Sequence, residues 1–471
     1  MSVTQKSKSE ISDFIDDSAI QSSLDAAAKV KVARAREVID KARALKGLEM
    51  DEVAVLLQCN DPAVLEEMFH TAREVKESIY GNRLVLFAPL YISNLCQNDC
   101  LYCAFRVRKD GGIRRRALTQ SEIADEVRYL VTTGHKRILL VAGEAYPSEG
   151  LDYIFKSIQT IYSTREGNGE IRRVNVNIAP LTVDEFSDLK AAKIGTYQLF
   201  QETYHRPTYK KMHVSGPKSN YEWRLTAIGR AFEGGINDVG IGVLFGLYDF
   251  RYEILALLQH IRHLEKNYGM GPHTISMPRL EPADGSEIAV NPPYPVSDMD
   301  FKRIVAILRL TVPYTGIIMT TRETAKMRAE TFALGVSQIS AASRTNPGGY
   351  TEGESATAQF QLGDHRGLDE VIADVVRLGY IPSFCTACYR LGRTGRDFMD
   401  LAKPGEIKRF CLPNAIMTFK EYLEDYATPE TRKSGLAAIE KNLQDIPTET
   451  RLNETKKRLD KIEKGERDLY F

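Results

Sequence analysis

Three cysteines lie close together in residues 94–103, Asn-Leu-Cys-Gln-Asn-Asp-Cys-Leu-Tyr-Cys, with the spacing Cys-x3-Cys-x2-Cys. Cys96, Cys100 and Cys103 can bind three irons of a 4Fe-4S cluster, which leaves the fourth iron with an open coordination position for chemistry. A structural zinc site would need a fourth nearby ligand, and only a distant histidine could supply it. A thioredoxin-like redox pair would leave Cys96 without a role. We therefore expect a cluster with an open iron.

A second set of three cysteines, Cys385, Cys388 and Cys411, has the spacing Cys-x2-Cys-x22-Cys. The same reasoning predicts a cluster with one iron that lacks a protein thiolate and is open to substrate or to another ligand. Structural zinc is a stronger rival here than at the first set. Three arginines flank this set in sequence: Arg390, Arg393 and Arg396. They could hold an anionic intermediate or a bound amino acid, or form a solvated helix end.

The composition excludes several classes of protein. The 471 residues include 63 Lys+Arg and 63 Asp+Glu, so no net charge draws the chain to nucleic acid or to an anionic membrane. Residues 1–20 are polar and acidic, and the longest apolar run, residues 84–92, is far too short to span a membrane. Seven cysteines are too few for a disulfide scaffold. These features predict a cytoplasmic protein. Because the other six cysteines form the two sets of three, we expect Cys59 to be a structural bystander. The basic run 106–116 is interpreted as a solvated loop.

From residue 84 onward, short apolar runs rich in β-branched residues alternate with amphipathic segments long enough to be helices. The predicted strands are residues 84–92, 137–142, 174–179, 197–201, 238–245, 274–280, 316–321 and 336–342. Thr119 with Glu122, and Thr182 with Glu185, form capping boxes that start two of the intervening helices. Eight strand–helix units predict parallel pairing in a closed (β/α)8 barrel of the TIM type, with an open doubly wound sheet as the competing α/β topology.

We expect helical additions at both ends of this barrel. Residues 1–80 have apolar and charged positions at helical spacing and form an N-terminal helical extension. The barrel occupies residues 81–350. After a Gly/Thr/Glu-rich linker, residues 351–471 form a mostly helical C-terminal domain that carries the second cysteine set. Its end, from residue 428, is rich in Lys and Glu and is predicted to be a solvated helical tail.

The first cysteine motif resembles the signature of the radical S-adenosylmethionine (radical SAM) superfamily, including the aromatic Tyr102 before the last cysteine. The resemblance implies that the open iron binds S-adenosylmethionine, which the cluster cleaves to a 5'-deoxyadenosyl radical. Gly143 and Glu144, after the second predicted strand, resemble the segment that contacts the methionine amino group. Gln201 and Glu202, after the fourth, resemble a segment near the ribose and methionine.

The second cysteine set makes the resemblance more specific within this superfamily. The Cys-Thr-Ala-Cys-Tyr-Arg segment at residues 385–390, together with the barrel, resembles the tyrosine-lyase maturases of iron-iron hydrogenases over almost the whole chain. The related tyrosine lyase of thiamine synthesis lacks such a C-terminal cluster. The resemblance implies that L-tyrosine is cleaved to p-cresol through a 4-oxidobenzyl radical. Dehydroglycine then becomes carbon monoxide and cyanide at a second 4Fe-4S cluster, where an additional labile iron leaves as an iron-carbonyl-cyanide unit.

A tyrosine substrate needs a cation for its carboxylate at the end of a barrel strand. Arg322 and Arg279 both follow predicted strands, and a guanidinium can bind a carboxylate through two hydrogen bonds. Similarity to aromatic amino-acid lyases favours Arg322, with Ser340 as a hydrogen-bonding neighbour. The alternative for Arg279 is an ion pair with Glu323 or Glu281 that rims the barrel.

An iron without thiolate ligands needs nitrogen or oxygen ligands, and histidine is the usual choice. His263 and His273 are both expected at the N-terminal end of the barrel, where either could reach the labile iron if the C-terminal domain covers that end.

Two other function classes remain open on the sequence. One is a radical SAM enzyme with another substrate, such as a tryptophan lyase or a sulfur-insertion enzyme. The other is a non-catalytic iron-sulfur carrier, against which the Gly143-Glu144 segment argues, because delivery of a cluster needs no S-adenosylmethionine site. The expected partners are an electron-donor protein, other hydrogenase maturases and the apo-hydrogenase, with no nucleic acid and no membrane.

Overall fold

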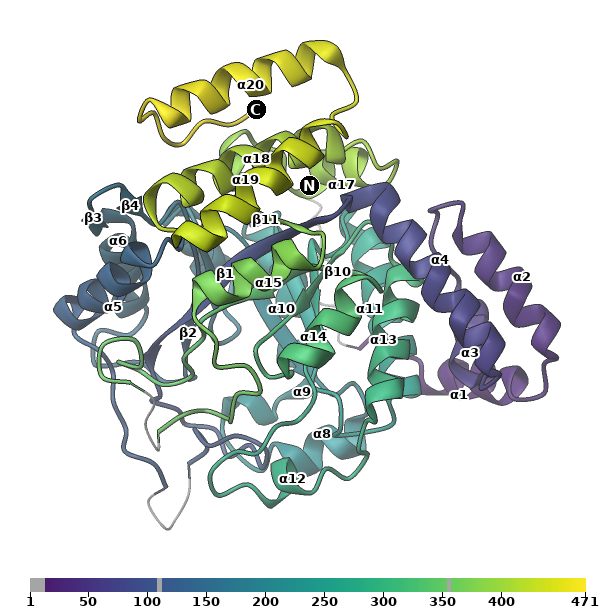
Figure 1. Cartoon of the computed structure of the whole chain (residues 1–471). Helices are drawn as coiled ribbons and strands as arrows, with labels where there is room; N and C mark the ends of the chain where they lie inside the picture. The colour runs from purple at the N-terminus through teal and green to yellow at the C-terminus, as the bar shows by residue number, and fades with distance from the viewer. Residues whose placement is uncertain (1–12, 108–111, 354–356) are drawn as a thin grey trace, which may run out of the picture.

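In the computed structural model, which describes residues 13–107, 112–353 and 357–471, eight parallel strands form a closed barrel (Figure 1). The barrel strands are β1 (Arg83–Ser93), β2 (Arg137–Ala142), β5 (Arg173–Asn177), β6 (Tyr197–Glu202), β7 (Val239–Val243), β8 (Thr274–Ser276), β9 (Gly316–Met319) and β10 (Val336–Ser340). β10 pairs with β1, so the barrel is closed and the open doubly wound alternative is excluded. All eight predicted strands are confirmed.

Helices cover the outside of the barrel, as the alternating pattern predicts. They are α5 (Gln120–Thr132), α6 (Leu151–Ser163), α7 (Val183–Ala191), α10 (Ala227–Glu233), α11 (Phe250–Tyr268), α13 (Asp298–Thr311) and α14 (Ala325–Phe332). Both predicted capping boxes are present, at the starts of α5 and α7. The connections contain α8 (Arg206–Met212), η2 (Pro217–Ser219), α9 (Tyr221–Leu225), α12 (Glu287–Val290) and the two-stranded sheet of β3 (Arg165–Glu166) and β4 (Gly169–Glu170).

The N-terminal region is helical, as predicted, and packs on one side of the barrel (Figure 1). Its helices are α1 (Asp17–Ala27), α2 (Val32–Ala42), α3 (Met50–Gln58) and α4 (Pro62–Tyr80). They contact the outer helices α11 and α13. The guanidinium of Arg303 on α13 donates hydrogen bonds to the carbonyls of Leu57 and Cys59 at the end of α3, which fixes this region to the barrel.

The C-terminal region is mostly helical and packs against the N-terminal end of the barrel. Its elements are α15 (Leu368–Arg377), β11 (Ile381–Ser383), α16 (Ala387–Arg390), α17 (Gly395–Ala402), α18 (Lys408–Asp425), α19 (Pro429–Leu443) and α20 (Glu449–Glu463). β11 was not predicted; it pairs in parallel with residues 83–85, the first residues of β1. This pairing brings the residues that follow β11 to the N-terminal ends of the barrel strands.

The prediction of a solvated tail after residue 428 is wrong. Ile439 and Leu443 of α19 are buried, and α19 packs against α15 and α18. After α20 the chain returns to α18, where the Phe471 backbone N–H donates to Asn414 Oδ1 at 2.8 Å. The many Lys and Glu residues lie on the outer faces of these helices. The composition of the segment therefore gave no sign that its inner face is packed.

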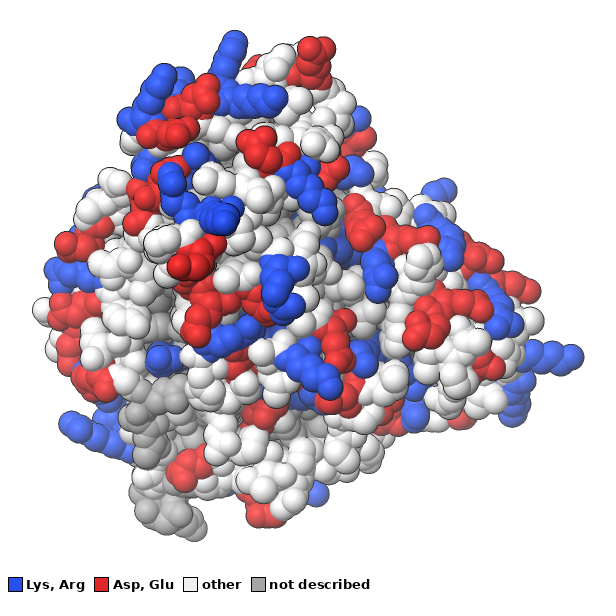
Figure 2. All heavy atoms as spheres, in the orientation of Figure 1, with Lys and Arg blue, Asp and Glu red and all other residues white. Residues whose placement is uncertain are grey.

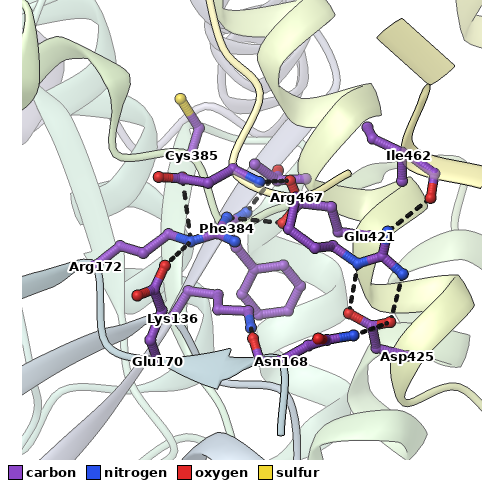
Figure 3. A network of polar contacts seen from close by, with 12 residues as sticks. Lys136, Asn168, Glu170, Arg172, Phe384, Cys385, Glu421, Asp425, Ile462 and Arg467 are labelled. Atoms are coloured by element: carbon purple, nitrogen blue, oxygen red, sulfur yellow. Dashed lines mark hydrogen bonds and ion pairs between the residues drawn. The ribbon is translucent and has the colours of Figure 1, made fainter. Parts of the chain in front are cut away.

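A buried ion pair connects this region to the barrel (Figure 3). Arg172, just before β5, lies 2.8 Å from Glu421 of α18, and the two side chains are only 3% and 1% exposed. The Asp468 backbone N–H donates to the same carboxylate at 2.7 Å. Two hydrogen bonds from Arg467 to Asp425 hold the returning chain beside it. Because an unpaired buried charge is costly, these contacts fix α18 relative to the barrel.

The surface carries no large region of one charge on the face that Figure 2 shows, where basic and acidic side chains are interspersed. This agrees with the zero net charge of the sequence. Among the described residues, no helix combines the length and the apolar character that crossing a bilayer would require.

Candidate functional site

The first cysteine set lines a cavity of about 180 Å³ at the C-terminal end of the barrel. β1 ends at Ser93, and the loop that carries Cys96, Cys100 and Cys103 follows directly. The backbone N–H of Leu101 donates to the carbonyl of Met212 at 2.9 Å, so a neighbouring segment holds the loop in place. Cys100 is buried and the other two cysteines are half-buried. The three thiols therefore face one enclosed space.

Gly143 lets the end of β2 approach this loop closely. A Cβ atom at this position would lie 2.1 Å from the carbonyl oxygen of Leu95, the residue before Cys96. The Gly143 backbone N–H also donates to the Ser93 carbonyl at 3.0 Å. Only glycine permits this contact, so Gly143 helps to place the cysteine loop as well as lining the cavity.

Two carboxylates and two cations meet beside the cysteines. Arg224 lies 2.8 Å from Glu144 and 3.7 Å from Glu202, and Lys218 lies 2.6 Å from Glu202. Asn98, inside the cysteine loop, donates to the other oxygen of Glu144 at 2.8 Å. Burial alone would raise the pKa of both carboxyls, but Lys218 and Arg224 outweigh it and lower both. The four side chains form a balanced ionic set on the cavity wall, of the kind that a zwitterionic amino-acid moiety can join.

The sequence reasoning missed Lys218 and Arg224. Both lie in the long connection between β6 and β7, in a stretch where no strand or helix was predicted. The length of that connection was the available signal, since long connections in compact domains are often functional.

The other residues predicted near S-adenosylmethionine differ in position. Tyr102 lines the cavity, and its hydroxyl is 2.8 Å from Nε2 of His213. Glu202 also lines the cavity, in a left-handed backbone conformation with φ of 73°. Gln201 is buried but is not among the lining residues, and its Nε2 has no hydrogen-bond partner in the described part of the chain.

The two candidate arginines have different partners. Arg279 is paired with Glu323, at 2.9 Å between Nε and Oε1, and with Asp298 at 2.9 Å. Arg322 lies over the ring of Phe360, 3.3 Å from its centroid, and within the described residues no carboxylate forms an ion pair with it. Burial is the main influence on the Arg322 guanidinium and lowers its pKa. In the part of the chain that the structure describes, Arg322 is thus a cation on the cavity wall without an acidic partner.

Ser340 lines the same cavity from the end of β10. Its Oγ accepts a hydrogen bond of 3.0 Å from the Thr321 backbone N–H. Ser340 therefore lies directly beside the segment that carries Arg322, and both can reach one ligand.

The second cysteine set lines a smaller cavity, of about 50 Å³, at the opposite end of the barrel. Cys411 comes from α18, Cys388 from α16 and Cys385 from the segment after β11. Burial, and then the neighbouring Cys411 and Cys385, raise the pKa of the Cys388 thiol to about 12. Irons bound between the three sulfurs would favour their thiolate forms. Cys59 lines neither cysteine cavity.

His273 lines the second cysteine cavity, whereas His263 does not. His273 Nδ1 is 2.5 Å from Asp238 Oδ2, and its ring stacks on Phe398 at 4.0 Å. The carboxylate fixes the proton on Nδ1 and leaves Nε2 available, which is the usual arrangement of a metal-binding histidine. His263 stacks on Phe14 at 3.7 Å and lines a separate surface cavity.

The arginines after Cys388 are held by the end of the chain. Arg390 forms an ion pair with Asp468, and Arg393 donates a hydrogen bond of 2.5 Å to the Phe471 carbonyl. Arg396 does not line the second cavity. Residues 108–111, within the predicted basic loop, and residues 354–356, within the predicted linker, lie outside the described residues.

Two family models match this chain, and the first of them includes Cys96, Cys100 and Cys103. Residues 90–261 match the family model "Radical SAM superfamily", and residues 276–381 match "Biotin and Thiamin Synthesis associated domain". The 2-iminoacetate synthase of Salmonella typhimurium (strain LT2) is 31% identical over 349 residues, which cover 73% of this chain and 89% of that protein. The closed barrel with its cysteine loop thus defines a radical SAM protein.

Two solved structures define the family more closely. A crystal structure of HydG, a maturase of the [FeFe]-hydrogenase, is 53% identical with a TM-score of 0.94, and the match covers 98% of this chain and all of that one. HydG from Carboxydothermus hydrogenoformans is 42% identical with a TM-score of 0.81, over 94% of this chain and 98% of that one. The chain belongs to the HydG family.

We predict that Gly143→Ala damages the first cysteine site. The added methyl group must displace the loop that carries Cys96, at a cost of about 1–3 kcal/mol in stability. Anaerobic reconstitution followed by EPR should show that most of the S-adenosylmethionine-responsive cluster signal is lost. Gly367→Ala is a matched control, because its φ is −65° and its Cβ would lie 3.4 Å from the nearest atom. Full signal in Gly143→Ala would contradict the role assigned to this glycine.

Proposed function

We propose that this protein is a radical SAM tyrosine lyase that makes an iron-carbonyl-cyanide precursor for [FeFe]-hydrogenase maturation. The observation that carries the proposal is the pair of three-cysteine sites at opposite ends of one barrel, with the unpaired Arg322 beside the first. Membership of the HydG family supports it, because the solved members are described as hydrogenase maturases. The similarity to 2-iminoacetate synthase supports an amino-acid substrate.

The first cavity fits the cofactors that the family implies. Cys96, Cys100 and Cys103 would hold a 4Fe-4S cluster, and the set of Glu144, Glu202, Arg224 and Lys218 would bind the methionine end of S-adenosylmethionine. When bound, these cofactors supply hydrogen-atom abstraction. Tyr102 would support the cofactor from the cavity wall, whereas Gln201 would act only by packing behind it.

The protein itself binds and orients the substrate. Arg322 holds the tyrosine carboxylate, Ser340 adds a hydrogen bond, and Phe360 keeps the guanidinium in place. Arg279 stays paired with Glu323 and supports the rim. The closed barrel excludes water from the cavity and so protects reactive species during the cleavage to p-cresol and dehydroglycine.

At the other end of the barrel, the second cysteine set would hold the auxiliary 4Fe-4S cluster, where dehydroglycine becomes carbon monoxide and cyanide. The labile iron is the cargo of the reaction, and His273 would bind it through Nε2. An electron-donor protein would reduce the first cluster, and other maturases and the apo-hydrogenase would receive the product. All seven cysteines are free, which fits a reducing compartment, and we place the protein in the cytoplasm.

One anaerobic assay tests this function. Reconstituted protein is incubated with reductant, S-adenosylmethionine and L-tyrosine, and p-cresol, 5'-deoxyadenosine and carbon monoxide are measured. We expect all three products. L-Tryptophan in place of L-tyrosine is the control for another amino-acid lyase. The formation of 5'-deoxyadenosine without p-cresol would indicate a different radical SAM substrate. The absence of both would leave an iron-sulfur carrier.

Alanine variants of the two arginines should give different results in this assay. Arg322→Ala should raise KM for L-tyrosine by roughly 30-fold or more with both clusters assembled, since a charge-assisted hydrogen bond contributes about 2 kcal/mol. Arg279→Ala should instead lower the thermal midpoint, because it leaves the buried Glu323 unpaired, and should leave KM unchanged. An unchanged KM in Arg322→Ala would rule out its substrate role.

The two histidines provide a second contrast. His273→Ala should reduce the iron content by about one atom per chain and suppress the iron-carbonyl-cyanide product, while p-cresol still forms. His263→Ala should change none of these quantities, because its ring packs on Phe14 away from the second cysteine cavity. Iron analysis and infrared spectroscopy of the C–O and C–N stretches report the outcome. Equal iron contents in His273→Ala and in the unsubstituted protein would refute the assignment.

A further inference from the structure

Residues 357–364, which follow the barrel in the chain, contribute Gln359, Phe360 and Leu362 to the lining of the first cavity. The backbone of this segment is held at several points: Gln361 N–H donates to the Pro282 carbonyl at 2.8 Å, and Gly363 N–H donates to the Thr321 carbonyl at 2.9 Å. Gln359 N–H donates to the Thr345 carbonyl at 2.9 Å, and the Gln359 carbonyl accepts from Ala104, next to Cys103, at 3.4 Å. The main chain of Gln359 is therefore attached to the cysteine loop.

The side chain of Gln359 connects a cavity residue to a cysteine. Its Nε2 lies 3.6 Å from Cys103 Sγ, and its Oε1 accepts a hydrogen bond of 2.7 Å from the Tyr91 hydroxyl. A cluster-bound thiolate accepts hydrogen bonds and cannot donate one, so the amide nitrogen must face the sulfur. The Tyr91 hydroxyl then donates to the remaining oxygen. The two partners thus fix a single orientation of the amide.

This contact lies in apolar surroundings. Tyr91, Phe105, Ile113 and Val141 form a buried cluster against which Cys103 packs. The Tyr91 and Phe105 rings meet edge to face, 6.0 Å apart. A hydrogen bond is stronger in such low-dielectric surroundings than in water. Within the described residues, Cys96 and Cys100 receive no side-chain hydrogen bond, so Gln359 distinguishes one thiolate of the three.

We propose that Gln359 is a positioning residue that raises the reduction potential of the first cluster through an N–H···S hydrogen bond to Cys103, in an orientation fixed by Tyr91. Reduction adds negative charge to the cluster and its thiolates, and a donor at the sulfur stabilises that charge. The inference rests on the cluster assigned to the first cysteine set, but it requires neither tyrosine cleavage nor the second site.

The test is an EPR-monitored redox titration of the reconstituted holoenzyme without L-tyrosine. The first cluster is identified by the change of its signal on addition of S-adenosylmethionine. Gln359→Leu has no donor and should lower the equilibrium constant for one-electron reduction of the cluster about tenfold. This corresponds to a shift of the reduction potential by about 59 mV toward negative values. Gln359→Glu should lower it further, because a carboxylate repels the thiolate. Tyr91→Phe should give a smaller shift in the same direction.

Gln361→Leu is the matched control, because this neighbouring side chain is exposed and should leave the potential unchanged. Wild-type potentials in both Gln359 variants would overturn the proposal. Failure of both variants to bind the cluster, with an unchanged circular dichroism spectrum, would also overturn it, because Gln359 would then serve cluster assembly. A shifted potential with no p-cresol from any variant or from wild type would uphold this inference and refute the proposed lyase activity.

Discussion

Closure of the barrel is the constraint on which the rest of this structure depends. Because all eight strands are parallel, their C-terminal ends meet at one mouth and their N-terminal ends at the other. The loop after β1 therefore brings Cys96, Cys100 and Cys103 to the same mouth as the ends of β2, β6, β9 and β10. β11, paired with the first residues of β1, brings the second cysteine set to the opposite end.

In the proposed function, this geometry separates two kinds of chemistry that would interfere in one site. The first cavity is lined by Gly143, the ionic set around Arg224 and Arg322, and it would suit enclosed radical chemistry on a small zwitterion. The second is lined by three thiols with His273, and it suits the binding of iron. The buried pair of Arg172 and Glu421 fixes α18, and with it Cys411, to the barrel, so that the second site has a defined position.

Local pattern was enough to predict the fold of the barrel. Its strands are β-branched runs, and most of its outer helices begin with a capping side chain, so these elements are specified within their own segments. β11 was not predicted because a strand of three residues is too short to show a hydrophobic period. Its hydrogen-bond partners come only from β1. The packed end of the chain escaped because its contacts, such as that of Phe471 with Asn414, join residues far apart in sequence.

The sequence indicated which types of residue form the candidate site, but not which side chains contact one another there. The spacing of the cysteines indicated both three-thiol sets. From the residues alone Arg322 and Arg279 were equal candidates, and only the resemblance favoured Arg322; in the folded chain Glu323 forms an ion pair with Arg279. The sequence also could not distinguish the surroundings of His273 from those of His263. In the folded chain His273 contacts Asp238, whereas His263 stacks on Phe14. These tertiary contacts leave no periodic signal in the sequence.

The proposed function assigns different reactions to the two ends of the barrel, and one assay measures both. The variant with Cys385, Cys388 and Cys411 all replaced by Ala is reconstituted, and p-cresol and carbon monoxide are measured in the same anaerobic reaction. We expect p-cresol to form at a rate close to that of the unsubstituted protein while carbon monoxide is lost. Loss of p-cresol in a folded variant that keeps its first cluster, or continued release of carbon monoxide, would contradict this assignment.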